Sequence, residues 1–179
     1  MGRSGRALWG SILRGSSWNS RLGYLGVRQE EPVINLSASI AIPRPREEVF
    51  AFISDVANMP KWVTGVVSAK LDTAEMEVGS TFTLQYRPNW RADSVVLQVV
   101  DFESPARLAT RSSKGPFHFE GTVTLSEVEG ATTVTNTIEA GPDSLSTKLA
   151  TLLLGPLLVR SMRKRLLKEL IALERAIVA

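Results

Sequence analysis

The sequence of 179 residues predicts a single α+β domain in which a curved antiparallel sheet of about seven strands wraps around a long C-terminal helix. Three patterns support this fold class. Apolar and polar residues alternate over 34–42, strand-like segments separated by turn residues fill 63–140, and apolar residues recur every three or four positions from 143 onward. The length suits one well-cored domain and is short for two.

Residues 1–32 differ in composition from the rest of the chain. Five arginines precede the first acidic residues, Glu30 and Glu31, and the remaining basic and acidic residues balance, so the net charge of +3 belongs to this segment. We expect a basic, disordered N-terminal extension over 1–32 and a folded domain over 33–179. The arginine- and serine-rich composition is also typical of an organelle transit peptide. Translation from an upstream start codon is a further alternative.

Composition excludes several classes of site. The chain has no cysteine, which excludes disulfides, thiolate metal sites and thiol nucleophiles and fits a reducing, cytoplasmic location. With His118 as its one histidine, a histidine-rich metal site is excluded too, and we expect no metal and no cofactor. The longest apolar run, 149–159, is broken by Gly155 and Pro156 and is too short to span a bilayer.

The first strand and the first helix are expected on either side of a proline pair. Residues 34–42 place their apolar side chains on one face, as a half-buried strand does. Pro43 and Pro45 end the strand, and Pro45 suits the first turn of a helix because its missing N–H is not needed there. The buried side of that helix is formed by four apolar side chains: Val49, Phe50, Phe52 and Ile53.

Six further strands are expected near 64–73, 80–88, 93–103, 107–113, 116–127 and 131–140. Strand alternation places Phe82, Leu84 and Tyr86 on one face of their strand. It also places Phe117 and Phe119 together, so that His118 and Glu120 point outward. His118 is therefore expected to be a surface histidine rather than a catalytic base.

The C-terminal helix is expected from about Asp143 to the end, with Pro156 kinking or splitting it. The part after Pro156 would run roughly 35 Å at about 1.5 Å per residue. A basic run lies on this helix, and most of its side chains are expected on a solvated face, with contact to anionic membrane lipid as the alternative. It consists of Arg160, Arg163, Lys164, Arg165 and Lys168. Nucleic acid binding is not expected, because the domain is neutral and no aromatic residues interleave with the basic run.

Four strings resemble the START-like, or SRPBCC, superfamily over about 33–178: "IPRPREEVFAFISDVANMPKW", "VVDFESPARLA", "GTVTLSEVEGATTVTNTIE" and "GPLLVRSMRKRLLKELIALERAI". This superfamily contains polyketide cyclases and dehydratases and lipid-transfer domains. The resemblance implies the helix-grip fold, with two short helices after the first strand and a cavity between sheet and C-terminal helix. It implies that Asp55 caps the second short helix near Asn58 and that Trp62 closes one end of the cavity. The superfamily shares no catalytic motif, so the resemblance leaves the activity open.

We predict that the cavity binds a small hydrophobic or amphipathic molecule such as a lipid or a polyketide, held by burial and a few hydrogen bonds. The predicted ligand-binding residues are Trp62, Phe82, Leu84, Tyr86, Phe102, Phe117, Phe119, Asn136 and Met162. Asn136 lies on an apolar strand face, so its buried amide needs a partner, either the Tyr86 hydroxyl or a ligand. No catalytic residue is assigned.

Two alternatives to a binding protein stay open. A cofactor-free enzyme of the cyclase or dehydratase type would recruit its acid or base from a short set of polar residues: Tyr86, Asn136, Asp101 and Glu139. A quinone- or lipid-binding protein of an organelle would agree with the arginine-rich N-terminal segment.

Overall fold

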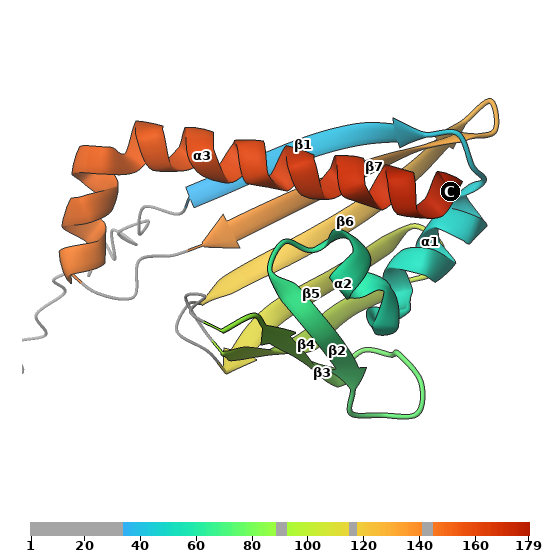
Figure 1. Cartoon of the computed structure of the whole chain (residues 1–179), viewed down its shortest axis with the longest axis horizontal. Helices are drawn as coiled ribbons and strands as arrows, with labels where there is room; N and C mark the ends of the chain where they lie inside the picture. Colours follow the sequence, from blue (N-terminus) through green and yellow to red (C-terminus); the bar gives the residue numbers. More distant parts are fainter. Residues whose placement is uncertain (1–33, 89–92, 115–117, 141–144) are drawn as a thin grey trace, which may run out of the picture.

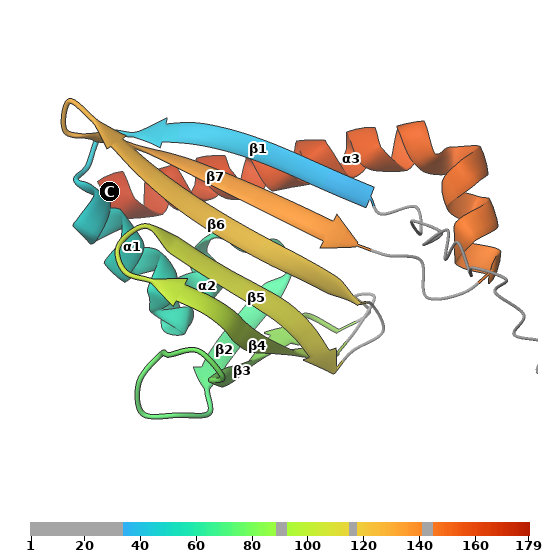
Figure 2. The same ribbon diagram turned by 180° about the vertical axis from the view of Figure 1, so that it is seen from behind.

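A computed structural model of the chain describes residues 34–88, 93–114, 118–140 and 145–179; side chains are described from Asn35 in the first strand and from Val159 in the last helix. Within these ranges seven antiparallel strands form one curved sheet in the order β1-β7-β6-β5-β4-β3-β2. The long helix α3 and the short helices α1 and α2 lie on one side of this sheet (Figures 1 and 2). The predicted α+β, helix-grip fold is confirmed.

The elements occur in the predicted order. The chain starts with β1 (Ile34–Ile42), α1 (Arg46–Ser54), a 3₁₀ turn η1 (Val56–Asn58) and α2 (Met59–Trp62). The meander consists of β2 (Val66–Leu71), β3 (Thr81–Tyr86), β4 (Ser94–Glu103), β5 (Arg107–Lys114), β6 (Phe119–Val128) and β7 (Ala131–Ala140), and α3 (Leu145–Val178) follows. Each expected strand is present, with ends that differ by a few residues because strand ends depend on pairing with neighbours.

The hydrophobic core lies between the sheet and the helices. α3 packs against β1 and α2, and its residues Leu166, Leu170 and Leu173 are 2% exposed or less. From the sheet side, Phe82 and Val134 are fully buried. Burying side chains of this size contributes roughly 1.5–3 kcal/mol each, so this layer supplies much of the free energy of folding.

The turn between α1 and α2 is held by Asp55. Its carboxylate accepts hydrogen bonds from the backbone N–H of Ala57 at 3.0 Å and from Nδ2 of Asn58 at 3.2 Å. Asp55 is a cap as predicted, but it caps the 3₁₀ turn η1 and not α2, whose N-cap residue Asn58 forms no side-chain cap bond. The short α2 then ends at Trp62, which is buried.

Helix α3 is one continuous helix through Pro156, and its N-terminal part bends away from the rest (Figure 1). Of the two expected effects of the proline, a bend is found and a split is not. The C-terminal part runs along the sheet and brings the residues after Val159 over its concave side (Figure 1). In the part of the chain that the structure describes, no helix combines the length and the apolar character needed to cross a membrane.

Candidate ligand-binding cavity

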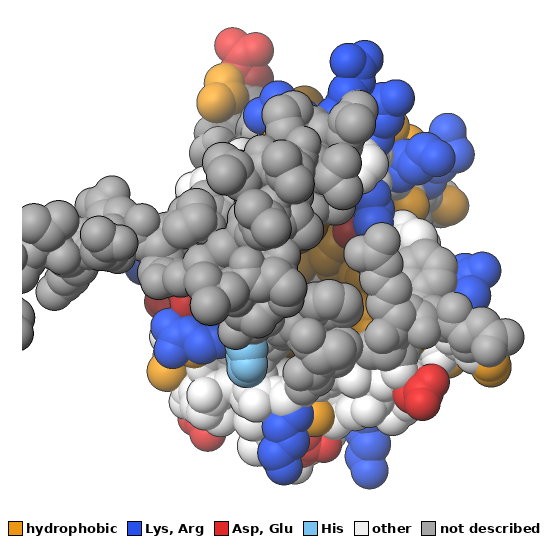
Figure 3. Space-filling model, turned by 90° about the vertical axis from the view of Figure 1, so that its left-hand side faces the viewer, with side chains coloured by type: hydrophobic (Ala, Val, Ile, Leu, Met, Phe, Trp, Pro, Cys, Tyr) orange, Lys and Arg blue, Asp and Glu red, His pale blue; other side chains and the backbone are white. Residues whose placement is uncertain are grey.

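A cavity of about 160 Å³ lies between the concave face of the sheet and the helices α2 and α3. Its wall is mostly apolar and is formed by strands β3 to β7 together with both helices. Figure 3, a view onto one side of the molecule, shows hydrophobic side chains at the bottom of a hollow in the surface. Six of the nine predicted ligand-binding residues line the cavity: Trp62, Phe82, Leu84, Tyr86, Phe119 and Asn136.

The three other predicted residues are placed differently. Phe102 does not line this cavity: its ring packs against Phe50 of α1 at a centroid distance of 5.5 Å. Leu97 and Val99 of β4 are buried, and the pairing of β4 with β5 shifts after Val99, which resets the alternation and brings Phe102 against the same core, next to α1 rather than at the cavity. Phe117 lies outside the described residues.

Met162 is half-buried on α3 and is not among the described residues that line the cavity. It lies one helical turn before Leu166, and the described side chains of α3 that line the cavity are Arg165 and Glu169. Helical periodicity predicts which face of α3 is buried but not how far along the helix the cavity extends.

Arg165 and Glu169 form an ion pair at the cavity wall that the sequence analysis did not predict. Glu169 is 7% exposed, and its Oε1 accepts hydrogen bonds from Nε of Arg165 at 2.9 Å and from the backbone N–H of Thr64 at 3.1 Å. Arg165 Nη2 donates to the backbone C=O of Thr64 at 3.1 Å. The pair therefore binds both backbone groups of Thr64, which lies in the connection between α2 and β2.

A signal for Glu169 is present in the sequence. Glu169 lies three residues after Leu166 and four before Leu173, which are both core residues, so it lies on the buried face of α3. An acidic residue on such a face needs a partner, and Arg165, four residues earlier, is in position to be one. Arg165 was grouped with the basic run; its guanidinium instead lies against Thr64 and Glu169.

Tyr86 brings a hydroxyl to the same wall. Burial raises the pKa of the Tyr86 phenol above its ordinary value of 10.0, the positive charge of Arg165 lowers it, and the negative charge of Glu169 raises it. The net shift is upward, so the phenol is neutral at physiological pH. A neutral phenol both donates and accepts hydrogen bonds.

Two further polar groups at the wall lack partners among the described residues. Asn136 is 8% exposed, and its amide forms no hydrogen bond to another described side chain or backbone group; of the two partners considered for it, Tyr86 and a ligand, the ligand stays a prediction. Nε1 of Trp62 is buried and, within the same ranges, has no acceptor. Buried polar groups are normally paired, which makes both groups candidates for contact with a ligand.

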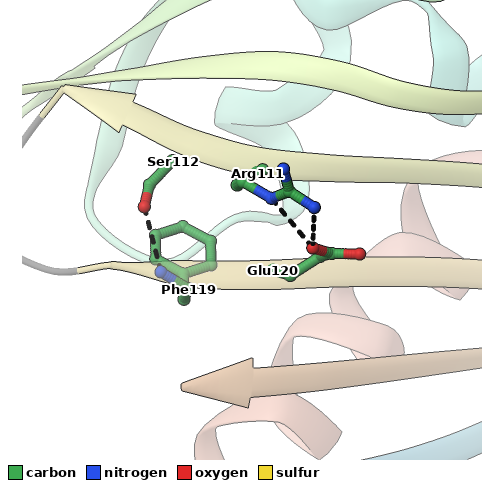
Figure 4. A network of polar contacts seen from close by, with 4 residues as sticks. All are labelled: Arg111, Ser112, Phe119 and Glu120. Carbon is green, nitrogen blue, oxygen red and sulfur yellow. Dashed lines mark hydrogen bonds and ion pairs between the residues drawn. The ribbon is translucent and has the colours of Figure 1, made fainter. Parts of the chain in front are cut away.

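Two further polar contacts join β5 to β6 (Figure 4). Arg111 of β5 donates from Nε and Nη2 to Oε2 of Glu120 on β6, at 3.0 and 2.8 Å. Ser112 Oγ accepts the backbone N–H of Phe119 at 2.9 Å. These contacts join β5 to β6 where Phe119 contributes its ring to the cavity wall. His118, just before β6, is exposed, as predicted.

Two acids considered for catalysis lie elsewhere. Asp101 forms an ion pair with Arg107 at 2.6 Å, and Glu139 is exposed and accepts a hydrogen bond from Asn35 at 3.0 Å. Neither is among the described residues that line the cavity. Over the described ranges, no three side chains of the metal-binding types lie close enough together to hold a metal ion.

Comparison with solved structures shows the same fold in several proteins. A protein from Thermus thermophilus has a TM-score of 0.65 and 19% identity, with 81% of this chain and 97% of that chain covered. A protein from Deinococcus radiodurans has a TM-score of 0.54 and 17% identity, with 79% of this chain and 95% of that chain covered. The di-domain ARO/CYC StfQ from the steffimycin biosynthetic pathway has a TM-score of 0.61 and 11% identity, covering 80% of this chain and 50% of that chain.

No curated protein matches the chain in sequence. The family described as polyketide cyclase/dehydrase and lipid transport matches residues 33–175, which include every described strand and nearly all of α3. The resemblance inferred from the sequence strings is thereby confirmed, and the chain belongs to the polyketide cyclase/dehydrase and lipid transport family.

Proposed function

We propose that this protein binds one small, mostly apolar molecule in the cavity between the sheet and α3. The observation that carries the proposal is a mostly apolar cavity of about 160 Å³ whose wall holds aromatic side chains and a buried indole N–H, that of Trp62, without an acceptor among the described residues. An engineered apolar cavity of about 150 Å³ in another protein holds benzene, so the space suits one ring or the ring-sized end of a longer molecule. Family membership supports a ligand of lipid or polyketide type.

Four aromatic side chains form much of the apolar surface of the cavity wall. Trp62, Phe82, Tyr86 and Phe119 all line the cavity, and rings stack on or meet the edges of other rings favourably. An apolar body would be held by burial, at roughly 25 cal/mol for each Å² removed from water. The amide of Asn136 would orient a polar end.

Titration of the full chain with toluene, followed by calorimetry, tests this function. We expect saturable binding at about one site per chain, as a single cavity of this size requires. Native mass spectrometry of the purified chain would identify any molecule that it retains. A folded chain that binds neither toluene nor benzene at any attainable concentration would disprove the proposal.

A cofactor-free cyclase or dehydratase is the alternative. It is supported by the family and by the carboxylate of Glu169 and the neutral phenol of Tyr86, which line the same cavity and are a potential base and acid. Incubation with a linear polyketide substrate analogue, with products analysed by mass spectrometry, distinguishes the two functions. A binding protein returns the analogue unchanged.

Location and membrane contact are secondary proposals. All five side chains of the basic run, Arg160, Arg163, Lys164, Arg165 and Lys168, are exposed, and Figure 3 shows a cluster of basic side chains at one edge of the molecule. We infer peripheral contact with anionic lipid, which salt should weaken. Cosedimentation with phosphatidylserine vesicles at low and high salt tests it.

A quinone- or lipid-binding role in an organelle, in place of a cytoplasmic one, rests on residues 1–32 and is tested by imaging a fluorescent fusion of the full chain.

A further inference from the structure

We propose that the cavity selects an uncharged ligand that carries a hydroxyl group on an apolar, ring-sized body, and that Glu169 accepts the hydrogen bond from this hydroxyl. This inference rests on the proposed binding function and specifies its ligand class. It follows from the hydrogen-bonding capacity that the cavity wall leaves unused.

Only one of the two carboxylate oxygens of Glu169 accepts hydrogen bonds from the described residues. Both of its hydrogen bonds, from Thr64 and from Arg165, end on Oε1. Oε2 accepts no hydrogen bond from the described residues, and the side chain lines the cavity while being 7% exposed. An ionised carboxylate has about four acceptor positions. Oε2 is therefore an acceptor available to a molecule inside the cavity.

A hydroxyl matches the remaining polar groups better than a carbonyl does. A ligand hydroxyl would donate to Oε2 of Glu169 and accept from a donor such as the Asn136 amide. A carbonyl can accept from Asn136 but has no proton for Glu169, so Oε2 would gain no hydrogen bond from such a ligand. A hydrogen bond to a charged acceptor is about twice as strong as a neutral one, so the loss would be large.

A carboxylate ligand fits worse still. The charge of Glu169 is balanced by Arg165, whose Nε and Nη2 already bind Glu169 and Thr64. A second carboxylate would bring another negative charge close to Glu169 inside a mostly apolar wall. Burial of a like charge next to an existing one is strongly unfavourable. The cavity should therefore reject ring-sized acids.

Four ring-sized molecules test this selection on the unmodified full chain at neutral pH: toluene, anisole, phenol and benzoate. Phenol is uncharged at this pH and benzoate is ionised. We expect phenol to bind about tenfold more tightly than anisole or toluene, the factor that one good hydrogen bond provides, and benzoate not to bind. Calorimetry gives each dissociation constant.

A substitution of Glu169, the proposed acceptor, tests its role directly. In Glu169→Gln we expect the preference for phenol over toluene, measured as the ratio of their dissociation constants in the same variant, to fall to about threefold or less, because a neutral amide accepts more weakly. Glu174→Gln is the matched control: Glu174 is a half-buried acid on the same helix that does not line the cavity, and its variant should keep the preference.

The outcomes separate the two proposals. If toluene and phenol both fail to bind, the binding function itself is wrong. If toluene binds and phenol binds no more tightly than anisole, or if benzoate binds as well as phenol, the binding function stands and the role of Glu169 is only to hold Thr64. Should Glu169→Gln fail to fold, the ligand series on the unmodified chain decides alone.

Discussion

Glu169 accepts a hydrogen bond from the backbone N–H of Thr64 at 3.1 Å, across 105 positions of the sequence. This contact ties α3 to the turn that leads from α2 into β2. The carboxylate is nearly fully buried, so its removal would leave the backbone N–H of Thr64 without its acceptor and would take one partner away from Arg165.

We expect Glu169→Ala to lower the free energy of unfolding by about 1–3 kcal/mol, the cost of leaving a buried donor unpaired. Urea denaturation measures the change. Glu174→Ala, on the same helix, should cost about 0.5 kcal/mol or less, as substitutions away from such contacts do. Equal effects of the two substitutions would show that the Thr64 contact does not stabilise the fold.

Asp55→Ala should lower the free energy of unfolding by about 0.5–2 kcal/mol, because the N-cap of η1 loses its acceptor. His118→Ala should leave both stability and toluene affinity nearly unchanged, since His118 is exposed. Thermal and chemical denaturation measure the first effect, and calorimetry the second. Loss of ligand binding in a stable His118→Ala protein would refute the outward placement of this side chain.

Phe119→Trp should reduce toluene uptake at least several-fold, because the larger ring fills part of a cavity of about 160 Å³. His118→Trp adds the same side chain at the preceding, exposed position and should leave uptake unchanged. Titration of both variants under the same conditions makes the comparison. Similar behaviour of the two would argue against ligand binding in this cavity.

Deletion of residues 1–31 should leave the thermal midpoint nearly unchanged. The apolar residues of this segment follow no regular period, and ordering it would cost conformational entropy. Calorimetric melting of the full and the shortened chain tests this expectation. A decrease of more than about 5 °C would show that the segment packs on the domain.

The raised pKa of Tyr86 predicts a pH dependence with a definite sign. The folded state holds the phenol proton more tightly than the unfolded state does, so the contribution is fully present below pH 10.0, the ordinary pKa, and is lost as pH rises through the folded value. The unfolding free energy of the wild type should therefore fall more steeply above pH 10 than that of Tyr86→Phe. Parallel curves for the two proteins would contradict the upward shift.

Local patterns in the sequence were sufficient for the fold and for much of the cavity wall. The alternation of Phe82, Leu84 and Tyr86 and the position of Phe119 after an outward His118 follow from the two-residue period of a strand, which depends on backbone geometry alone. Asp55 could also be identified as a cap from the sequence, because a cap joins groups that are only a few residues apart. Such interactions are local in sequence.

Three features of the site were decided by tertiary structure. Phe102 packs against Phe50 of α1 rather than at the cavity, Met162 is not among the residues that line the cavity, and the packing of α3 on α2 brings Glu169 to Thr64. Each depends on contacts between segments far apart in the chain. Periodicity tells which side of an element is buried, whereas the partner that covers each position along it is set by how the sheet curves and where the helix crosses it.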